Sequence, residues 1–313
     1  MIKKKALNRI FISSIAIFIV FTFVSLNLIK EDKNIYKITD YTSAKKEFIY
    51  TLNEDNYVSK GYIYVSKDLT SLEKVKTLID TMIEKNNKNA LLPSYFKPIL
   101  PQNTKVLSAE LENKIIKINF SSEFLNVSDS QLEKMVEAIT YTLTEIDDIN
   151  GVEIYVEGEL LKYVSNMKNI PTILTKDIGI NKKYEITSNN NISKIVLYFL
   201  GENDNLIPIT KYVNDDREKI EIIVESLSNN YIFYDNLISV LSYNLKLEDY
   251  EICDDTLILV FNDFIYDNLE EKTVNENLID IISYSIFDNY DVSKVIFMEN
   301  NNKISEKLRK NLE

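Results

Sequence analysis

One order of predicted elements occurs twice along this chain, and this duplication limits its possible folds more than any other sequence feature. Ile116, Ile118 and Phe120 are spaced to share one face of a strand. Leu257, Leu259 and Phe261 repeat that spacing 141 positions later, since 261 − 120 = 141. Residues two apart lie on the same face of a strand, so both triplets are expected to point into a core. A unit that recurs in this way indicates two similar domains.

Four stretches with helical apolar spacing predict the helices of the two units. Each begins with a Ser/Thr/Asp-x-x-Glu/Gln pattern, whose side chains bind backbone N–H groups at a helix start. The four pairs are Thr70 and Glu73, Ser128 and Gln131, Asp215 and Glu218, and Thr273 and Glu276.

Short apolar runs around these helices predict strands. They are Tyr62–Val65, Val106–Leu111, Ile115–Phe120 and Val152–Val156, then Ile195–Leu200, Val240–Leu247, Leu257–Phe261 and Val295–Met298. The order β-α-β-β-α-β predicts an α+β fold in which each unit is a two-layer sandwich, with a helix pair on one face of a sheet. In the last strand we align Ile154 and Val156 with Ile296 and Met298. The expected core markers are Phe120, Phe124, Phe261 and Phe264.

These elements predict a first domain at residues 56–165 and a second at 192–303. A linker at 166–191, with Pro171, Gly179 and a run of polar residues, joins them, and residues 304–313 form a tail.

Residues 10–29 form an uncharged apolar stretch that is long enough to cross a lipid bilayer as one helix. The basic segment 1–9 precedes it. Since positive charge favours the cytoplasmic side, we expect a signal anchor with a cytoplasmic N-terminus, a juxtamembrane segment at 30–55 and an extracytoplasmic body. A cleaved signal peptide is the alternative, although no small-x-small cleavage pattern follows.

The composition excludes several classes of function. The chain has 0 His and 1 Cys, which excludes His-based catalysis, common zinc sites and an intrachain disulfide. Net charge is −12; residues 1–30 carry 5 Lys and Arg and no acids, so the rest carries −12 − 5 = −17. Such a body repels nucleic acid. With only 5 Gly, no glycine-rich phosphate loop is available either. We therefore expect no nucleic-acid partner, no cofactor and no metal.

The remaining candidates for chemistry favour structural interpretations. Asp147-Asp148, Asp215-Asp216 and Asp254-Asp255 are paired carboxylates, but each lies at a predicted turn or helix start, where acids cap backbone N–H groups. Asn203-Asp204-Asn205 is better explained as a hairpin tip than as a calcium loop. Acidic neighbours make Cys253 a poor nucleophile.

Bulky residues follow the first helix of each unit and are candidate partner contacts, because interface centres are enriched in aromatic residues. They are Leu91, Leu92, Tyr95 and Phe96 in the first unit and Tyr231, Phe233 and Tyr234 in the second. The alternative is that they close the edge of the core.

Three segments of the first unit resemble the GerMN domain. They are Leu100–Leu111, Ile115–Asn126 and Leu143–Gly158, and they follow one another at the spacing of that family. The family pattern places Leu100-Pro101 and Thr104 before a strand, Phe124 after the next strand, and Thr142-Leu143-Thr144-Glu145 at a helix end. Asn103 stands where the family has Gly, and Asn119-Phe120 stands where it has Asp-Leu.

This resemblance covers roughly Tyr62 to Asn300 and implies a non-catalytic interaction module of sporulation and germination. The resemblance implies a location in the intermembrane space between mother cell and forespore. It also implies that the partners are other envelope proteins of a trans-envelope complex. The resemblance also implies assembly, so we expect a possible homo-oligomer.

A different class of function stays open as an alternative. A peptidoglycan-binding module could stack sugars on Tyr62, Tyr64 and Tyr155. A carboxylate-dependent wall hydrolase is the least favoured interpretation.

Overall fold

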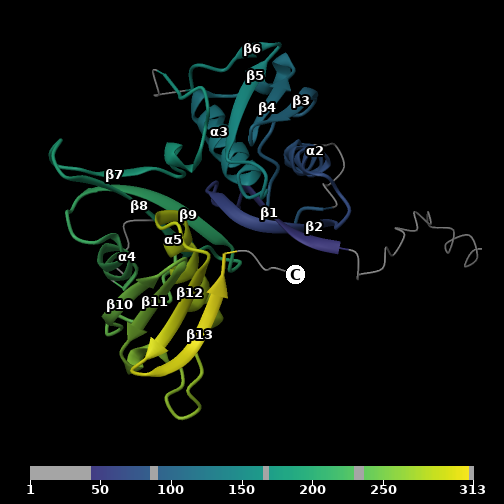
Figure 1. Ribbon diagram of the computed structural model, residues 1–313. Helices are drawn as coiled ribbons and strands as arrows, with labels where there is room; N and C mark the ends of the chain where they lie inside the picture. The colour runs from purple at the N-terminus through teal and green to yellow at the C-terminus, as the bar shows by residue number, and fades with distance from the viewer. Residues whose placement is uncertain (1–43, 85–90, 165–168, 229–235, 310–313) are drawn as a thin grey trace, which may run out of the picture. The chain divides into compact units, whose positions relative to one another are not determined.

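The computed structural model describes residues 44–84, 91–164, 169–228 and 236–309 (Figure 1). The predicted tail 1–9, the predicted anchor 10–29 and most of the juxtamembrane segment lie outside the described residues. Within the described ranges, no helix is both long enough and apolar enough to cross a membrane. Lys45–Glu313 form one compact unit, and the rest of this description concerns that unit alone.

Each repeat has the order β-β-α-β-β-α-β-β, with two strands more than predicted. One unpredicted strand ends each repeat, and the other comes before the first predicted strand in the first repeat (Ala44–Leu52) but after it in the second (Leu206–Asn214). The first repeat consists of β1 (Ala44–Leu52), β2 (Val58–Ser66), α2 (Ser71–Met82), β3 (Val106–Glu112), β4 (Ile115–Phe120), a 3₁₀ turn (Ser122–Leu125), α3 (Asp129–Leu143), β5 (Gly151–Val156) and β6 (Glu159–Leu160).

A 3₁₀ turn (Lys176–Ile178) and the short strand β7 (Lys183–Glu185) lead into the second repeat. This repeat consists of β8 (Ile192–Leu200), β9 (Leu206–Asn214), α4 (Lys219–Ser228), β10 (Leu247–Cys253), β11 (Thr256–Phe261), a 3₁₀ turn (Asp263–Ile265), α5 (Glu276–Asn289), β12 (Lys294–Glu299) and β13 (Asn302–Leu308).

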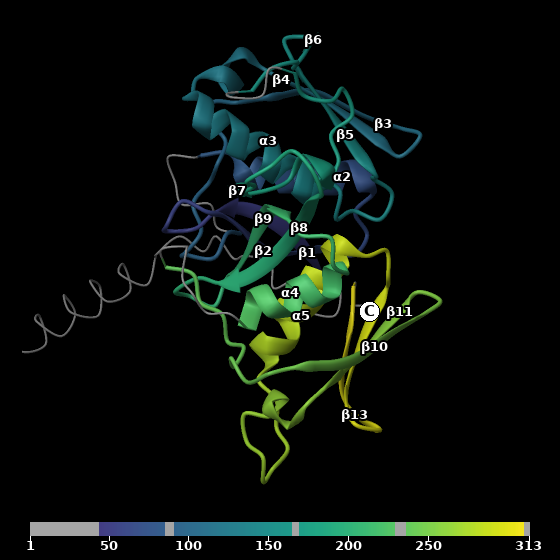
Figure 2. The ribbon, with the colours of Figure 1, turned by 90° about the vertical axis from the view of Figure 1, so that its left-hand side faces the viewer.

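Within the residues that the structure describes, the strands form three sheets. Each repeat has a four-stranded sheet of its own, in the orders β3-β4-β5-β6 and β10-β11-β12-β13, with the two central strands parallel. The third sheet is shared: hairpin β1–β2 of the first repeat joins hairpin β8–β9 of the second through β2 and β9, with β7 also on β9 (Figures 1 and 2). The mixed α+β fold is therefore as expected, but the two repeats are joined through a common sheet.

The shared sheet changes the predicted limits of the folded body. β1 begins at Ala44, within the stretch 30–55 that was expected to be juxtamembrane. The expected linker 166–191 contains a 3₁₀ turn and β7, and the expected tail 304–313 includes most of β13.

Two of the four predicted helix starts match the structure. The Thr70 hydroxyl and Glu73 form the reciprocal capping box of α2, and the Ser128 hydroxyl accepts from the N–H of Gln131 at the start of α3. The other two predictions are wrong. α4 begins at Lys219, and Asp215 forms an ion pair with Arg217 instead of starting the helix. α5 begins at Glu276 and is capped by Asn275.

Three strand predictions need correction. The strand before β11 is β10, not Val240–Leu247, and its turn at Asp254-Asp255 is as tight as the Asn113-Lys114 turn of the first repeat. Ile154 on β5 and Phe297 on β12 are equivalent, because each pairs with the equivalent residue of its neighbouring parallel strand, β4 or β11. Ile296 and Met298 therefore face outward, because a slip of one residue exchanges the two faces of a strand.

Each repeat has its own apolar core, which its helices cover on one side of the four-stranded sheet. Phe120 and Phe124 stack on each other in the first core, and Phe261 lies in the second, all fully buried. Phe264 is 49% exposed and is not the core residue that we expected. The 3₁₀ turn after β11 instead points the next residue, Ile265, into the core.

Candidate functional site at the junction of the two repeats

Two tyrosines from equivalent strands meet where the repeats join. Tyr50 is the seventh residue of β1 and Tyr198 is the seventh residue of β8. Their hydroxyl oxygens lie 3.0 Å apart, and both rings are buried. Residues 148 positions apart therefore contact each other through the same position of the repeated unit.

A carboxylate from each repeat accepts a hydrogen bond from its own tyrosine. The Tyr50 hydroxyl donates to Glu145, just after α3, at 3.0 Å, and the Tyr198 hydroxyl donates to Asp288, in α5, at 2.6 Å. The backbone repeats the correspondence. The N–H of Tyr50 donates to the Thr142 hydroxyl at 2.9 Å, and the N–H of Tyr198 donates to the Ser285 hydroxyl at 2.9 Å.

Two lysines complete this cluster, which we call the junction network (Tyr50, Lys60, Glu145, Lys176, Tyr198 and Asp288). Lys60, on β2, binds Glu145 at 2.9 Å and the Tyr50 hydroxyl at 2.9 Å. Lys176 lies 2.8 Å from Glu145 and 2.8 Å from Asp288, so its ammonium group bridges the two repeats. The side chains of Lys60 and Glu145 are only 3% and 8% exposed.

Burial and charge shift the pKa values of these groups. Burial by itself would raise the pKa of Glu145, but the ammonium groups of Lys176 and Lys60 lower it well below its usual range. Burial likewise opposes the charge of Lys176, yet Asp288 and Glu145 raise its pKa. For Lys60 burial prevails and the pKa is lowered. Burial and then Glu145 raise the pKa of Tyr50. Glu145 is therefore ionised and Tyr50 is protonated at neutral pH.

Such an arrangement fixes the geometry of the junction. A buried ion pair whose lone pairs and protons are fully used adds little net free energy, but removing one partner leaves a buried charge unpaired. Any change in how the two repeats pack would leave a buried charge unpaired. The network therefore holds the repeats in one relative orientation.

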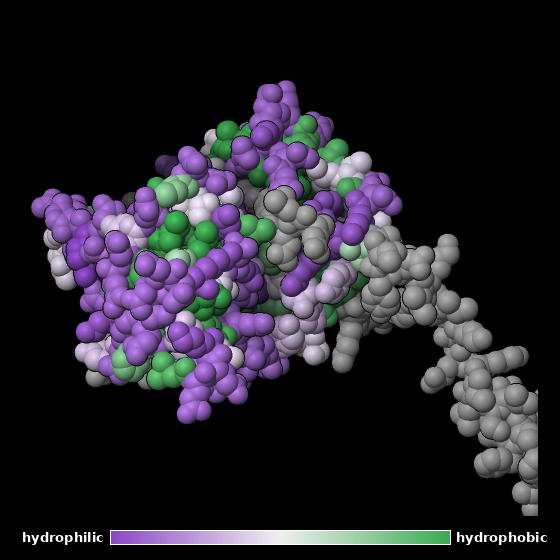
Figure 3. All heavy atoms as spheres, turned by 60° about the horizontal axis from the view of Figure 1, so that its bottom comes forward, coloured by the Kyte–Doolittle hydropathy of each residue, from purple (hydrophilic) through white to green (hydrophobic). Residues whose placement is uncertain are grey.

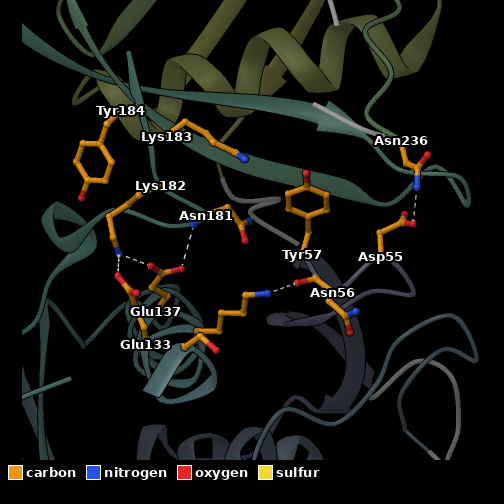
Figure 4. Close-up of a pocket in the computed structure, with 12 residues that line it drawn as sticks. Asp55, Asn56, Tyr57, Glu133, Glu137, Asn181, Lys182, Lys183, Tyr184 and Asn236 are labelled. Atoms are coloured by element: carbon orange, nitrogen blue, oxygen red, sulfur yellow. Dashed lines mark hydrogen bonds and ion pairs between the residues drawn. The ribbon is translucent and has the colours of Figure 1, made fainter. Parts of the chain in front are cut away.

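A polar pocket of about 680 Å³ lies on another part of the junction (Figure 4). Lys182 turns toward Glu133 and Glu137 on α3, and the N–H of Asn181 donates to Glu137 at 3.0 Å. The Asn181 amide also bonds the carbonyl groups of Val58 on β2 and of Pro208 on β9, at 2.7 and 2.8 Å, and so spans the gap between the two hairpins. At the pocket rim, the Tyr184 ring is 65% exposed and stacks on Tyr212.

The structure brings together only part of the predicted contact residues. Phe96 is buried, with its ring against Gly61 on β2, and Leu92 packs on the first core. Tyr95 is half-buried and in contact with Phe96, while Leu91 stays 50% exposed. Tyr231, Phe233 and Tyr234 lie outside the described residues.

The paired carboxylates take structural positions. Asp148 accepts from the Ser71 hydroxyl at 2.7 Å, Asp215 pairs with Arg217, and Asp255 accepts from the Ser293 hydroxyl at 2.6 Å. Asn203–Asn205 form the tip of hairpin β8–β9, where the N–H of Gly201 donates to the carbonyl of Asn205. Cys253 is exposed. The described residues contain no group of three or more acidic or Cys side chains placed to hold a metal ion.

Sequence reasoning did not predict the junction network. Its residues come from six places in the chain, and only Glu145 was noted, as part of the Thr142-Leu143-Thr144-Glu145 helix end. One signal was present: Tyr141, Thr142 and Glu145 recur as Tyr284, Ser285 and Asp288, each 143 positions later, which marks a repeated polar helix end.

The two repeats with their shared sheet, fastened by buried polar groups, resemble tandem GerMN domains. Residues 48–162 match the family described as "Germane: Sporulation and spore germination". The chain is 24% identical over 276 residues to "Spore germination protein GerM" of Bacillus subtilis strain 168. The aligned region covers 85% of this chain and 74% of that protein.

A solved structure shares this fold. It is described as "Tandem GerMN domains of the sporulation protein GerM from Bacillus subtilis", and it matches with a TM-score of 0.73 at 22% identity. The match covers 83% of this chain and 92% of that one. The likeness therefore extends over both repeats, not only the first.

Proposed function

We propose that this protein acts in sporulation as a membrane-anchored, extracytoplasmic and non-catalytic scaffold that assists a trans-envelope complex between mother cell and forespore. The observation that carries the proposal is the similarity to GerM over both repeats, with 276 aligned residues. The junction network supports a scaffold role, because it makes one body of two binding modules and fixes the spacing between their surfaces. Other envelope proteins are the expected partners.

Deletion of the gene in the source organism tests the sporulation role. We expect heat-resistant spore counts to fall by orders of magnitude while vegetative growth stays unchanged, and a plasmid copy of the full chain should restore the counts. Normal counts in the deletion strain would contradict the proposal.

The single cysteine allows a direct test of location. Cys253 is the 1 Cys of the sequence and it is exposed, so a membrane-impermeant maleimide can reach only this thiol. A hydrogen bond with Glu251, burial and nearby acids raise the pKa of the Cys253 thiol, so labelling should be done near pH 8.5.

If the body is extracytoplasmic, intact protoplasts of vegetative cells that express the chain should label fully, because no second membrane encloses it there. Labelling that needs prior lysis would place the body in the cytoplasm and would exclude the proposed location. Cys253→Ser is the matched control for background labelling.

A second candidate function is binding of wall glycan. The exposed Tyr184 ring at the rim of the polar pocket favours it, because flat aromatic faces suit sugar rings. The purified chain should then sediment with peptidoglycan, and Tyr184→Ala should weaken this binding. Tyr163→Ala, which removes another exposed ring, is the control. Equal sedimentation of the two variants would exclude this pocket as the site. Release of soluble wall fragments would instead support a hydrolase.

A further inference from the structure

The outer faces of the two four-stranded sheets differ in chemistry, although the sheets have the same topology. In the first sheet, the register places Glu110, Lys117 and Glu153 side by side in one row across β3, β4 and β5. The next row contains Ser108, Asn119 and Tyr155. Opposite charges alternate in the first row and the second row is polar and uncharged, as expected of a face in water.

The same positions of the second sheet are aliphatic. Ile258 and Ile296 stand where the first sheet has Lys117 and Glu153, and Val260 and Met298 stand where it has Asn119 and Tyr155. All four side chains are half-buried and point away from the core, which Leu257, Leu259, Val295 and Phe297 fill from the opposite face. These four residues, Ile258, Val260, Ile296 and Met298, are called the outer strip.

Charged residues border the outer strip on both sides. On β10, Asp249 lies opposite Val260 and Glu251 lies opposite Ile258. On β13, Glu306 lies opposite Ile296, and Lys303 lies opposite Met298 and is paired with Glu306 at 2.9 Å. The border thus has an excess of acidic groups. On the end of the molecule where this sheet lies, hydrophobic side chains are gathered among hydrophilic ones (Figure 3).

An aliphatic strip with an acidic border has the anatomy of an interface: an apolar centre and a charged rim. The first repeat provides an internal comparison, because the same scaffold keeps the equivalent face polar when it meets only water.

We propose that the outer strip is the docking surface for a partner segment that is apolar on one side and rich in Lys or Arg around that side. Charge selects this partner over a second copy of the chain. The chain beyond residue 30 carries −17, and two such bodies repel each other. The same charge disfavours an anionic membrane surface. This proposal rests on the interaction role proposed above and gives the chemical class of its partner.

Binding of synthetic peptides to the purified full chain tests the surface without reference to sporulation. One fluorescent probe is a 14-residue amphipathic peptide of Leu and Lys, and the other has Glu in place of every Lys. We expect only the Leu/Lys peptide to bind, and more weakly in 0.5 M salt than in 0.05 M salt, because salt screens the border charges.

The double variant Ile258→Thr/Ile296→Thr should weaken binding of the Leu/Lys peptide about tenfold or more, since two apolar side chains leave the contact. Threonine keeps the strand preference of isoleucine, so the melting temperature should stay close to that of the wild type. The matched control is Lys117→Thr/Glu153→Thr on the first sheet, which should bind as the wild type does. Should the double variant fold poorly, Asp249→Asn/Glu251→Gln tests the same surface by weakening the charge contribution.

Three results would overturn the proposal. They are equal affinity of the Leu/Lys peptide for both double variants, equal binding of the Leu/Glu peptide, and a wild-type dimer in sedimentation that Ile258→Thr/Ile296→Thr dissociates. The dimer result would mean that a second copy of the chain occupies the outer strip. Because this assay reads binding and the deletion strain reads spore counts, failure of one is distinguishable from failure of the other.

Discussion

A single carboxylate oxygen of Glu145 accepts three hydrogen bonds, from the Tyr50 hydroxyl, the Lys60 ammonium and the Lys176 ammonium. We predict that Glu145→Gln destabilises the protein by roughly 3–5 kcal/mol, because it leaves the buried Lys60 ammonium without a charge partner, whereas Lys176 keeps Asp288. Chemical unfolding followed by circular dichroism measures this loss. Glu112→Gln is the matched control: it removes the same charge from the exposed pair with Lys117 and should leave stability nearly unchanged. Equal behaviour of the two variants would mean that the junction network does not hold the repeats together.

The loss of folding stability at acidic pH should also depend on Glu145. The folded-state pKa of Glu145 is lowered, so its contribution is present above the unfolded carboxyl pKa of about 4.3 and is lost as the pH falls toward the folded value. We expect wild-type stability to decline below about pH 5, with a shallower decline in Glu145→Gln. Urea midpoints at pH 3 to 7 measure this difference. Parallel curves would show that other carboxylates cause the acid sensitivity.

At the scale of single residues, the sequence predicted burial better than contact. The two-residue spacing was enough to place Phe120 and Phe261 inward. Phe264 faces outward because Ile265, 141 positions after Phe124, takes the place of Phe124 in the 3₁₀ turn that follows the strand. The junction network could not be predicted, since a contact between Tyr50 and Tyr198 depends on how the hairpins of two repeats pair.

Among the elements, the segment after α2 is fastened to β2 by the ring of Phe96. A Cβ atom added at Gly61 would lie 2.3 Å from that ring, so the strand accepts only glycine there. We predict that Gly61→Ala displaces Phe96 and costs about 1–3 kcal/mol by overpacking. In the double variant Gly61→Ala/Phe96→Leu, the smaller side chain relieves the clash, and the two effects should be less than additive. Thermal melts of the four proteins measure the coupling, and strict additivity would contradict the proposed contact.

The elements also show which sequence signals are dependable. Capping patterns predicted α2 and α3, where the Thr70 and Ser128 hydroxyls accept from backbone N–H groups of the first turn. At the fourth predicted start Thr273 instead donates to Asp267, and Asn275 caps α5. β10 was missed because its Glu248, Asp249 and Glu251 obscure the apolar alternation. β9 contains Pro208, and proline is unusual within a paired strand because it has no N–H. The carbonyl of Pro208 still accepts a hydrogen bond, from the side-chain amide of Asn181.

For the whole molecule, the shared sheet predicts that the two repeats unfold together. The Tyr198 hydroxyl of the second repeat donates to Asp288, and its oxygen lies 3.0 Å from the Tyr50 hydroxyl oxygen of the first repeat, so losing it affects both repeats. We predict one calorimetric transition for the wild type, and for Tyr198→Phe a loss of about 1–3 kcal/mol with the transition still single. Tyr243→Phe, which changes an exposed ring of the same repeat, should leave the transition in place.

Native-state hydrogen exchange locates the effect. In Tyr198→Phe, amides of α3 in the first repeat should lose as much protection as amides of α5 in the second, because a cooperative unit opens as a whole. Faster exchange confined to α5, or two separate calorimetric transitions, would show that the repeats are independent domains in contact. A rigid pair suits the proposed scaffold role, since the relative orientation of the two repeats is then set by the buried Tyr, Glu, Asp and Lys side chains at the junction and not by a linker.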